Sequence, residues 1–232
     1  IGAEALIRWQ HPQRGLLSPA TFMPLIEDHP ISVELGEWVI DTALAQIDAW
    51  RAGGLDLPVS VNVGARQLLE GSFSARLSAV LAAHPDVPHD RLELEILETS
   101  ALEDVAQVSE LMYACLESGV SFSLDDFGTG YSSLTYLKQL PARMLKIDQS
   151  FVRGMLDDPN DLAIVNGVIG LASAFRRQVI AEGVETVAHG AKLLALGCEL
   201  AQGYGIARPM PATDLPGWAA NWKPDAVWRS SV

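Results

Sequence analysis

Short apolar segments alternate with longer amphipathic segments along the whole chain. The short apolar segments predict strands, and they span residues 3–9, 57–63, 91–97, 120–126, 143–148, 178–182 and 199–203. The longer segments have the helical period, and they predict helices near residues 34–52, 66–83, 102–118, 161–175 and 187–196. Ser18 followed by Pro19 predicts a further helix start. This order of elements predicts an α/β protein with a parallel sheet.

Polar residues gather at or near the C-terminal ends of the predicted strands. They are Asn62, Glu95, Asp125, Asp126, Lys146, Asp148, Glu182 and Gln202. In a (β/α)8 barrel these strand ends converge on one face, where active sites are built. The pattern therefore favours a barrel over an open doubly wound sheet, although seven predicted strands are one fewer than a complete barrel has.

Carboxylates that converge on one face repel one another, so either their pKa values rise or cations lie between them. Carboxylate and amide oxygens are hard ligands that suit Mg²⁺ or Mn²⁺. Taken singly, each residue has an ordinary alternative as a solvated strand face, a helix cap or an ion pair. The whole set favours a metal site. The glycine loop in SLDDFGTGYSSL, residues 123–134, would then receive phosphate through metal ions, since Asp125 and Asp126 would repel it directly.

Composition narrows the choice of partner and compartment. The 232 residues carry a formal net charge of −13 with no basic run, which argues against binding DNA, long RNA or anionic membranes. The five histidines lack zinc-ligand spacing, and no G-x-S-x-G motif is present. Cys115 and Cys198 are expected to be buried free thiols rather than a disulfide, which is typical of a reducing cytoplasm. We expect a cytoplasmic protein, or the cytoplasmic domain of a membrane-anchored signalling protein.

Seven ordered motifs carry a resemblance to a known family. AEALIRW, SVNVGARQL, LELEILETS, LDDFGTGYSSL, LKIDQSFV, IAEGVET and AQGYGIARPM together resemble the EAL domain, the cyclic di-GMP phosphodiesterase family. The resemblance implies a modified (β/α)8 barrel that hydrolyses cyclic di-GMP to linear pGpG with two Mg²⁺ or Mn²⁺ ions. It also implies a homodimer, and a single EAL-type domain over residues 1–232.

The resemblance assigns a role to each matched residue. The first metal ion would be held by Glu4, Asn62, Glu95 and Asp125, and the second by Asp125, Asp126 and Glu182. The catalytic residues would be Lys146, which would contact the attacking water, Asp148, which would support the second metal site, and Glu182, a general-base candidate. The substrate group would comprise Arg8 at a phosphate, with Glu185 and Gln202 facing the substrate or supporting the ligands. Glu98 would brace the loop Phe127–Tyr131, which in this family couples the site to dimerisation.

The chain departs from the family pattern in three places, one of which is the structural variation IEDHPIS, residues 26–32, in place of the usual A-E-x-x-G. Leu97 stands where the family usually has Thr, next to the loop brace. The family's first strand, with a substrate-contacting Gln-Pro, is expected before Ile1, so we interpret the chain as an N-terminally truncated part of a longer protein. An upstream sensory or diguanylate cyclase domain fits this interpretation. The rival hypothesis is a catalytically weak or inactive domain that serves as a cyclic di-GMP receptor or as a protein-interaction module.

Overall fold

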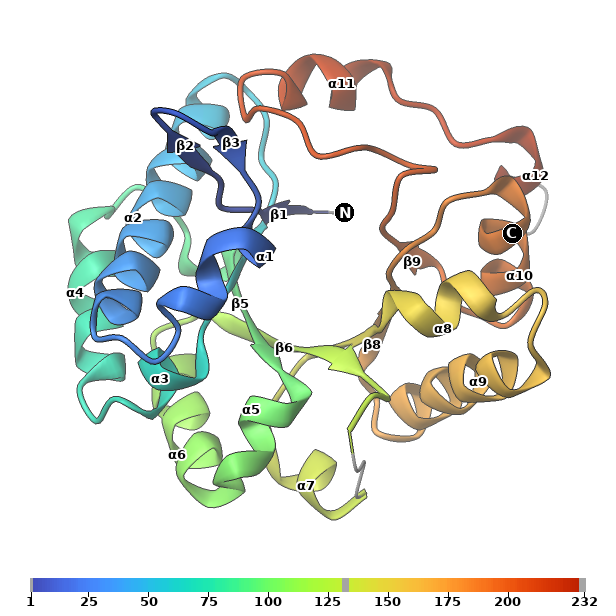
Figure 1. Ribbon diagram of the computed structural model, residues 1–232, viewed down its shortest axis with the longest axis horizontal. Helices are drawn as coiled ribbons and strands as arrows, with labels where there is room; N and C mark the ends of the chain where they lie inside the picture. The colour runs from blue at the N-terminus through green and yellow to red at the C-terminus, as the bar shows by residue number, and fades with distance from the viewer. Residues whose placement is uncertain (1, 131–133, 230–232) are drawn as a thin grey trace. The chain divides into compact units, whose positions relative to one another are not determined.

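The computed structural model describes residues 2–130 and 134–229 (Figure 1). The chain divides into two compact units. The first comprises residues 1–122 and 139–141, and the second comprises residues 123–138 and 142–232. Each unit contains parallel strands followed by helices, as the alternation of short and long apolar segments predicts.

The first unit is built on three parallel strands. β4 (Val59–Asn62) pairs with β1 (Ala3–Ala5) on one side and with β5 (Leu92–Leu97) on the other. Buried side chains on β4 alternate with more exposed ones, as expected for a strand with one covered face. On β5, Leu94, Glu95 and Ile96 are all buried, which indicates that both faces are covered there. The helices of this unit are α2 (Ile31–Ala52), α3 (Ala65–Leu69), α4 (Phe73–Ala83), α5 (Glu98–Glu103) and α6 (Val105–Leu116). A 3-10 turn, η2 (His89–Arg91), leads into β5.

The prediction of one strand over residues 3–9 is wrong. β1 ends at Ala5, and β2 (Trp9–His11) pairs antiparallel with β3 (Gly15–Leu17) in a separate hairpin. The turn forms because Gly15 adopts a positive φ of 72°, which costs glycine little, and because His11 Nδ1 accepts the Gln13 backbone N–H at 3.1 Å. After the hairpin come α1 (Pro19–Phe22), with Ser18 at its predicted N-cap, and the 3-10 turn η1 (Met23–Leu25).

The second unit contains four parallel strands in sequence order. They are β6 (Ser121–Phe127, whose first two residues belong to the first unit), β7 (Met144–Ile147), β8 (Gln178–Ala181) and β9 (Leu200–Ala201). Its helices are α7 (Leu134–Gln139, whose last residue belongs to the first unit), α8 (Gln149–Gly154), α9 (Pro159–Ala174), α10 (Val187–Ala195), α11 (Leu215–Asn221) and α12 (Ala226–Arg229). The four shorter helices α7, α8, α11 and α12 were not predicted, because they are too brief to show a helical period.

Two predicted helices are each split. Residues 66–83 form α3 and α4 on either side of residues 70–72, and residues 102–118 include a break at Asp104. Asp104 begins α6 as an N-cap, because its side chain accepts the Gln107 backbone N–H at 3.0 Å. The other helix predictions and the six remaining strand predictions are confirmed with slightly different bounds. Cys115 and Cys198 are buried free thiols, as predicted.

The C-terminal helix α12 is fixed to α10 through Trp228. The indole Nε1–H donates to the Val187 carbonyl at 2.9 Å. The ring occupies space that a side chain at Gly190 would fill, since a Cβ there would lie 2.4 Å from the indole nitrogen. Within residues 2–130 and 134–229, no helix has the length and hydropathy that crossing a membrane requires.

Candidate metal site

Two adjacent carboxylates can act together because the end of β6 is irregular. Neighbouring strand residues normally point to opposite faces, so alternation groups Asp125 with Ser121 and Ser123 but not with Asp126. The pairing of β6 with β7 shifts register between Leu124 and Phe127, which is the mark of a β-bulge. Asp126 takes a positive φ of 51°, and its backbone N–H donates to Asp125 Oδ1 at 3.0 Å. The bulge thereby directs both carboxylates to one side.

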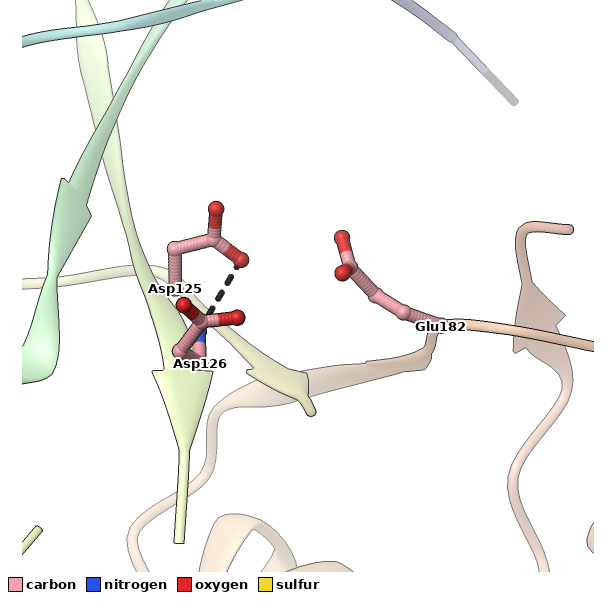
Figure 2. A group of neighbouring side chains, drawn as sticks. All are labelled: Asp125, Asp126 and Glu182. Carbon is pink, nitrogen blue, oxygen red and sulfur yellow. Dashed lines mark hydrogen bonds between the residues drawn. The ribbon is translucent and has the colours of Figure 1, made fainter. Parts of the chain in front are cut away.

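Glu182 completes a group of three carboxylates. It directly follows β8, and its backbone N–H donates to the Ile147 carbonyl of β7 at 3.1 Å. One oxygen from each of Asp125, Asp126 and Glu182 lies within 4.8 Å of the others. Figure 2 shows Glu182 pointing from its strand end toward the two aspartates of β6. Oxygen donors at this spacing suit a hard divalent cation, and the assignment of these three residues to a metal ion stays a prediction.

A buried lysine lies within the same group. The Lys146 ammonium is 3.1 Å from Asp125 Oδ1 and 2.7 Å from Glu182 Oε1. Only 2% of the residue is exposed, so these ion pairs are shielded from water. One ammonium compensates one of the three negative charges. The remaining charge favours binding of a cation or protonation of a carboxyl.

The pKa of Asp126 shows the effect of placing these carboxylates close together. Burial, the neighbouring charge of Asp125, and a hydrogen bond with Asp148 raise the pKa of Asp126 from 3.8 to about 6. Asp148 is itself fixed as the N-cap of α8, where its side chain accepts the Ser150 backbone N–H at 3.0 Å. Asp148 thus contacts Asp126, and its supporting role at a second metal ion stays a prediction.

The first unit brings together a second predicted group. Asn62 Nδ2 donates to Glu4 Oε1 at 2.9 Å. Glu95 is level with Asn62 in the pairing of β5 with β4, and it is 2% exposed. Glu98 is fully buried as the first residue of α5. Parallel pairing thus sets Glu95 level with Asn62, and Glu4 level with Ser60, two residues before Asn62.

The remaining predicted residues belong to both units, Arg8 to the first and Gln202 and Glu185 to the second. Arg8 is half-buried and donates to the Ile7 carbonyl at 2.8 Å. Gln202 follows β9, where its backbone N–H donates to the Ala181 carbonyl at 2.8 Å. Glu185 accepts a hydrogen bond from Arg153 Nε at 2.9 Å. Sequence reasoning missed Arg153, although a basic residue near the end of the helix that follows Asp148 was an available signal.

The proposed loop brace falls partly beyond the structural description. Glu98 belongs to the first unit, whereas the loop Phe127–Tyr131 belongs to the second. Tyr131 lies outside the described residues. Coupling of this loop to dimerisation stays a prediction.

Comparison with known proteins agrees with the fold. The EAL domain family matches residues 1–209. The bifunctional diguanylate cyclase/cyclic di-GMP phosphodiesterase MucR of Pseudomonas aeruginosa is 42% identical over 93% of this chain and 31% of its own length. The cyclic di-GMP phosphodiesterase PdeR of Escherichia coli is 37% identical over 93% of this chain and 32% of its own length. The chain therefore spans about a third of these relatives.

A solved structure, the PaMucR phosphodiesterase in complex with c-di-GMP, matches with a TM-score of 0.89 and 42% identity. The match covers 93% of this chain and 87% of that chain. The chain thus belongs to the EAL domain family. The predicted fold class, an α/β protein of the (β/α)8 type, is confirmed by this likeness and by the parallel strands with their helices.

Proposed function

We propose that this chain is a metal-dependent phosphodiesterase that hydrolyses cyclic di-GMP to linear pGpG. The observation that carries the proposal is the group of Asp125, Asp126 and Glu182 around the buried Lys146 ammonium. It occurs in a chain that is 42% identical to a phosphodiesterase solved with c-di-GMP. The relative PdeR is likewise named a cyclic di-GMP phosphodiesterase.

The donor set fits Mg²⁺ or Mn²⁺, because it consists of carboxylate and amide oxygens. By the family resemblance, two ions would be held by Glu4, Asn62, Glu95 and Asp125, and by Asp125, Asp126 and Glu182. Bound there, such ions would supply Lewis-acid chemistry to a phosphodiester. The resemblance alone assigns ligands from both units to one centre.

The protein's own side chains would prepare the hydrolytic water. Lys146 donates hydrogen bonds only, so it can orient a water through the oxygen lone pairs. Glu182, at 2.7 Å from Lys146 Nζ, can accept a proton from a water held there. Arg8 offers a bidentate fork for a substrate phosphate, and Gln202 and Glu185 would face the substrate.

A cyclic di-GMP receptor without catalysis is the second candidate. The sequence argues against it, since every position assigned to a metal ligand holds an oxygen donor. We further propose that the protein containing this chain works in second-messenger signalling as a homodimer in the cytoplasm. MucR, with its cyclase and phosphodiesterase name, supports an upstream cyclase or sensory domain. Light scattering would test the dimer.

Incubation of the purified chain with cyclic di-GMP and Mn²⁺, followed by chromatography, tests the activity. We expect pGpG from the wild type and from the control Asp48→Asn, an exposed residue of α2, but none from Asp125→Asn. Tight binding without product in the wild type would favour the receptor. Neither binding nor product would refute both candidates.

A further inference from the structure

The long helix α2 in the first unit has one face in the core and the opposite face in solvent. Its core side includes the fully buried Leu44 and Ile47. The opposite side has six uncharged residues at intervals of three or four, and all but the half-buried Leu35 are exposed: Ile31, Leu35, Trp38, Thr42, Ala45 and Ala49. At 3.6 residues per turn, these residues fall within about 80° around the helix axis. We call them the α2 stripe.

The α2 stripe exposes large apolar side chains in one line. Trp38 is 55% exposed and Ile31 is 48% exposed, and Leu35 lies between them along the helix. Single exposed apolar residues are common on protein surfaces, whereas a continuous group is typical of an interaction site. Tryptophan is also among the residues that contribute most to protein interfaces. The stripe therefore has the composition of a docking surface.

A row of carboxylates borders the stripe on the side of α4. Glu34, Asp41 and Asp48 are all exposed and lie seven residues apart, which places them along one side of the stripe. Asp41 Oδ1 lies 2.8 Å from Nε2 of His84, the residue that follows α4. The two helices pack against each other in the first unit (Figure 1). We call these three carboxylates the acidic row.

The arginines of these two helices mainly neutralise other carboxylates. Arg76 of α4 forms an ion pair with Glu37, and Arg51 of α2 lies 3.4 Å from Asp56. Among the groups that raise the pKa of Arg76, Glu37 contributes most and Glu34 contributes least. The acidic row thus keeps a net negative charge beside the apolar stripe.

A small hollow continues the acidic row at the end of α4. Its volume is about 100 Å³, and the residues that line it include Asp48, His84 and Asp86. In the part of the chain that the structure describes, neither Asp48 nor Asp86 forms an ion pair. Two carboxylates at a hollow of this size suit the ammonium of a lysine side chain, whose apolar stem can lie along the surface.

The spacing and the charge together define the occupant. Both the apolar residues Ile31, Trp38 and Ala45 and the acidic row repeat every seven positions, which is the repeat by which one helix packs along another. The carboxylates select lysine or arginine on the partner. A second copy would set one acidic row against another in a chain of net charge −13, and an anionic membrane would be repelled.

We propose that the α2 stripe and the acidic row dock a basic amphipathic helix of a partner protein. The apolar side of that helix would cover Trp38, and its lysine or arginine side chains would face Glu34, Asp41 and Asp48. Helix-on-helix recognition of this kind uses an apolar stripe for affinity and flanking charges for orientation. The inference goes beyond the proposed function and does not depend on it.

Calorimetric titration of the purified chain with two synthetic peptides tests the proposal. The first peptide is a helix of three heptads, about 21 residues, with leucine along one face and lysine beside it. The second has the same composition in an order that mixes leucine and lysine around the helix. We expect the first peptide to bind the wild type more tightly than the second, because only the first can present an apolar face and a basic edge together.

Substitutions at the two parts of the surface should act differently. Trp38→Ser should raise Kd for the first peptide at least about tenfold, as expected for a central aromatic contact. Glu34→Gln combined with Asp48→Asn should raise Kd about fivefold and weaken its dependence on salt. The matched controls Tyr113→Ser, at a residue 56% exposed, and Glu110→Gln, both on α6, should leave Kd unchanged.

Circular dichroism should show an unchanged fold, because every substituted residue is exposed. Glu34→Lys is a second test at one position, and it should weaken binding more than Glu34→Gln. An equal Kd for wild type and Trp38→Ser, equal binding of both peptides, or no binding of the first peptide would each overturn the proposal. Turnover of cyclic di-GMP is measured separately, so the proposed function would stand in each case.

Two further outcomes would assign the surface to another occupant and overturn the proposal. Self-association of the wild type that Trp38→Ser abolishes, measured by analytical ultracentrifugation, would assign it to a second copy. Sedimentation with phosphatidylglycerol vesicles that depends on Trp38 would assign it to a membrane. We expect neither, because the acidic row opposes both.

Discussion

The two carboxylate groups of this chain balance their charge in different ways. In the second unit, Asp125 and Glu182 each lie within 3.1 Å of the buried Lys146 ammonium. In the first unit, the hydrogen bond at Glu4 comes from the neutral amide of Asn62. One group thus contains a fixed cation, and the other contains a polar donor without charge. Substitutions should therefore affect stability and metal response differently in the two units.

The largest effect is expected from Asp125→Asn. This change removes one negative charge from the carboxylates around Lys146 and keeps the side-chain size. Turnover of cyclic di-GMP should fall by at least about a hundredfold, the order reported for loss of one strong transition-state contact. Steady-state kinetics and circular dichroism should be measured on the same samples. Wild-type turnover with an intact fold would contradict the assignment of Asp125 to the metal site.

Lys146→Met should show the cost of removing the fixed cation. Breaking a buried ion pair by deleting one partner costs about 3 kcal/mol, and Lys146 is 2% exposed. We expect a loss of that order in the free energy of unfolding with EDTA present, and partial recovery with Mn²⁺, which replaces the missing charge. Urea titrations should include Lys138→Met, an exposed lysine of α7. A loss of the same size in both variants would rule out a special role for Lys146.

Asn62→Ala should cost much less, because it removes a hydrogen bond at a solvent-exposed residue. At most about 1 kcal/mol of unfolding free energy should be lost. Asn62→Asp is the informative partner, since it sets a carboxylate against Glu4. Without metal it should be less stable than Asn62→Ala, and Mn²⁺ should reverse the order. If the two variants respond alike to Mn²⁺, this unit contributes no ligand at position 62.

The smallest effect concerns the pH dependence of the metal-free protein. The pKa of Asp126 is raised from 3.8 to about 6 in the folded state. Its favourable contribution to stability is therefore fully present below pH 3.8 and is lost as the pH rises through about 6. Asp126→Asn cannot ionise, and Asn tolerates the positive φ at this position. In EDTA, the stability of wild type relative to this variant should decline across that range. A constant difference would refute the raised pKa.

The sequence predicted the parts of the site that depend on strand order. The polar residues at predicted strand ends include Asn62 and Glu95, which the structure places at strand ends of the first unit, and Asp125, Lys146 and Glu182, which it places at or next to strand ends of the second. The letters LDDF are equally consistent with regular alternation, so the bulge that redirects Asp126 could not be predicted. It depends on the pairing of β6 with β7, which is a tertiary property.

For the wrong strand over residues 3–9 and the two helices predicted as continuous, the sequence did contain contrary signals, but the apolar pattern was given more weight. The run AEALIRW is apolar enough for one strand, yet Pro12 and Gly15 mark the turn of the hairpin that begins at Trp9. The helices over residues 66–83 and 102–118 were predicted as continuous, because the apolar residues before and after Gly71 and Asp104 keep the same helical period.

The left-handed backbone at Asp126 also limits how this protein can evolve. With φ at 51°, the position readily accepts asparagine, aspartate and glycine, while branched or bulky residues are strained there. Aspartate codons reach both asparagine and glycine codons by a single nucleotide change. The mutations that this position tolerates best therefore remove a carboxylate from the metal site without disturbing the chain. Loss of catalysis with retention of the fold is, for this lineage, one mutational step away.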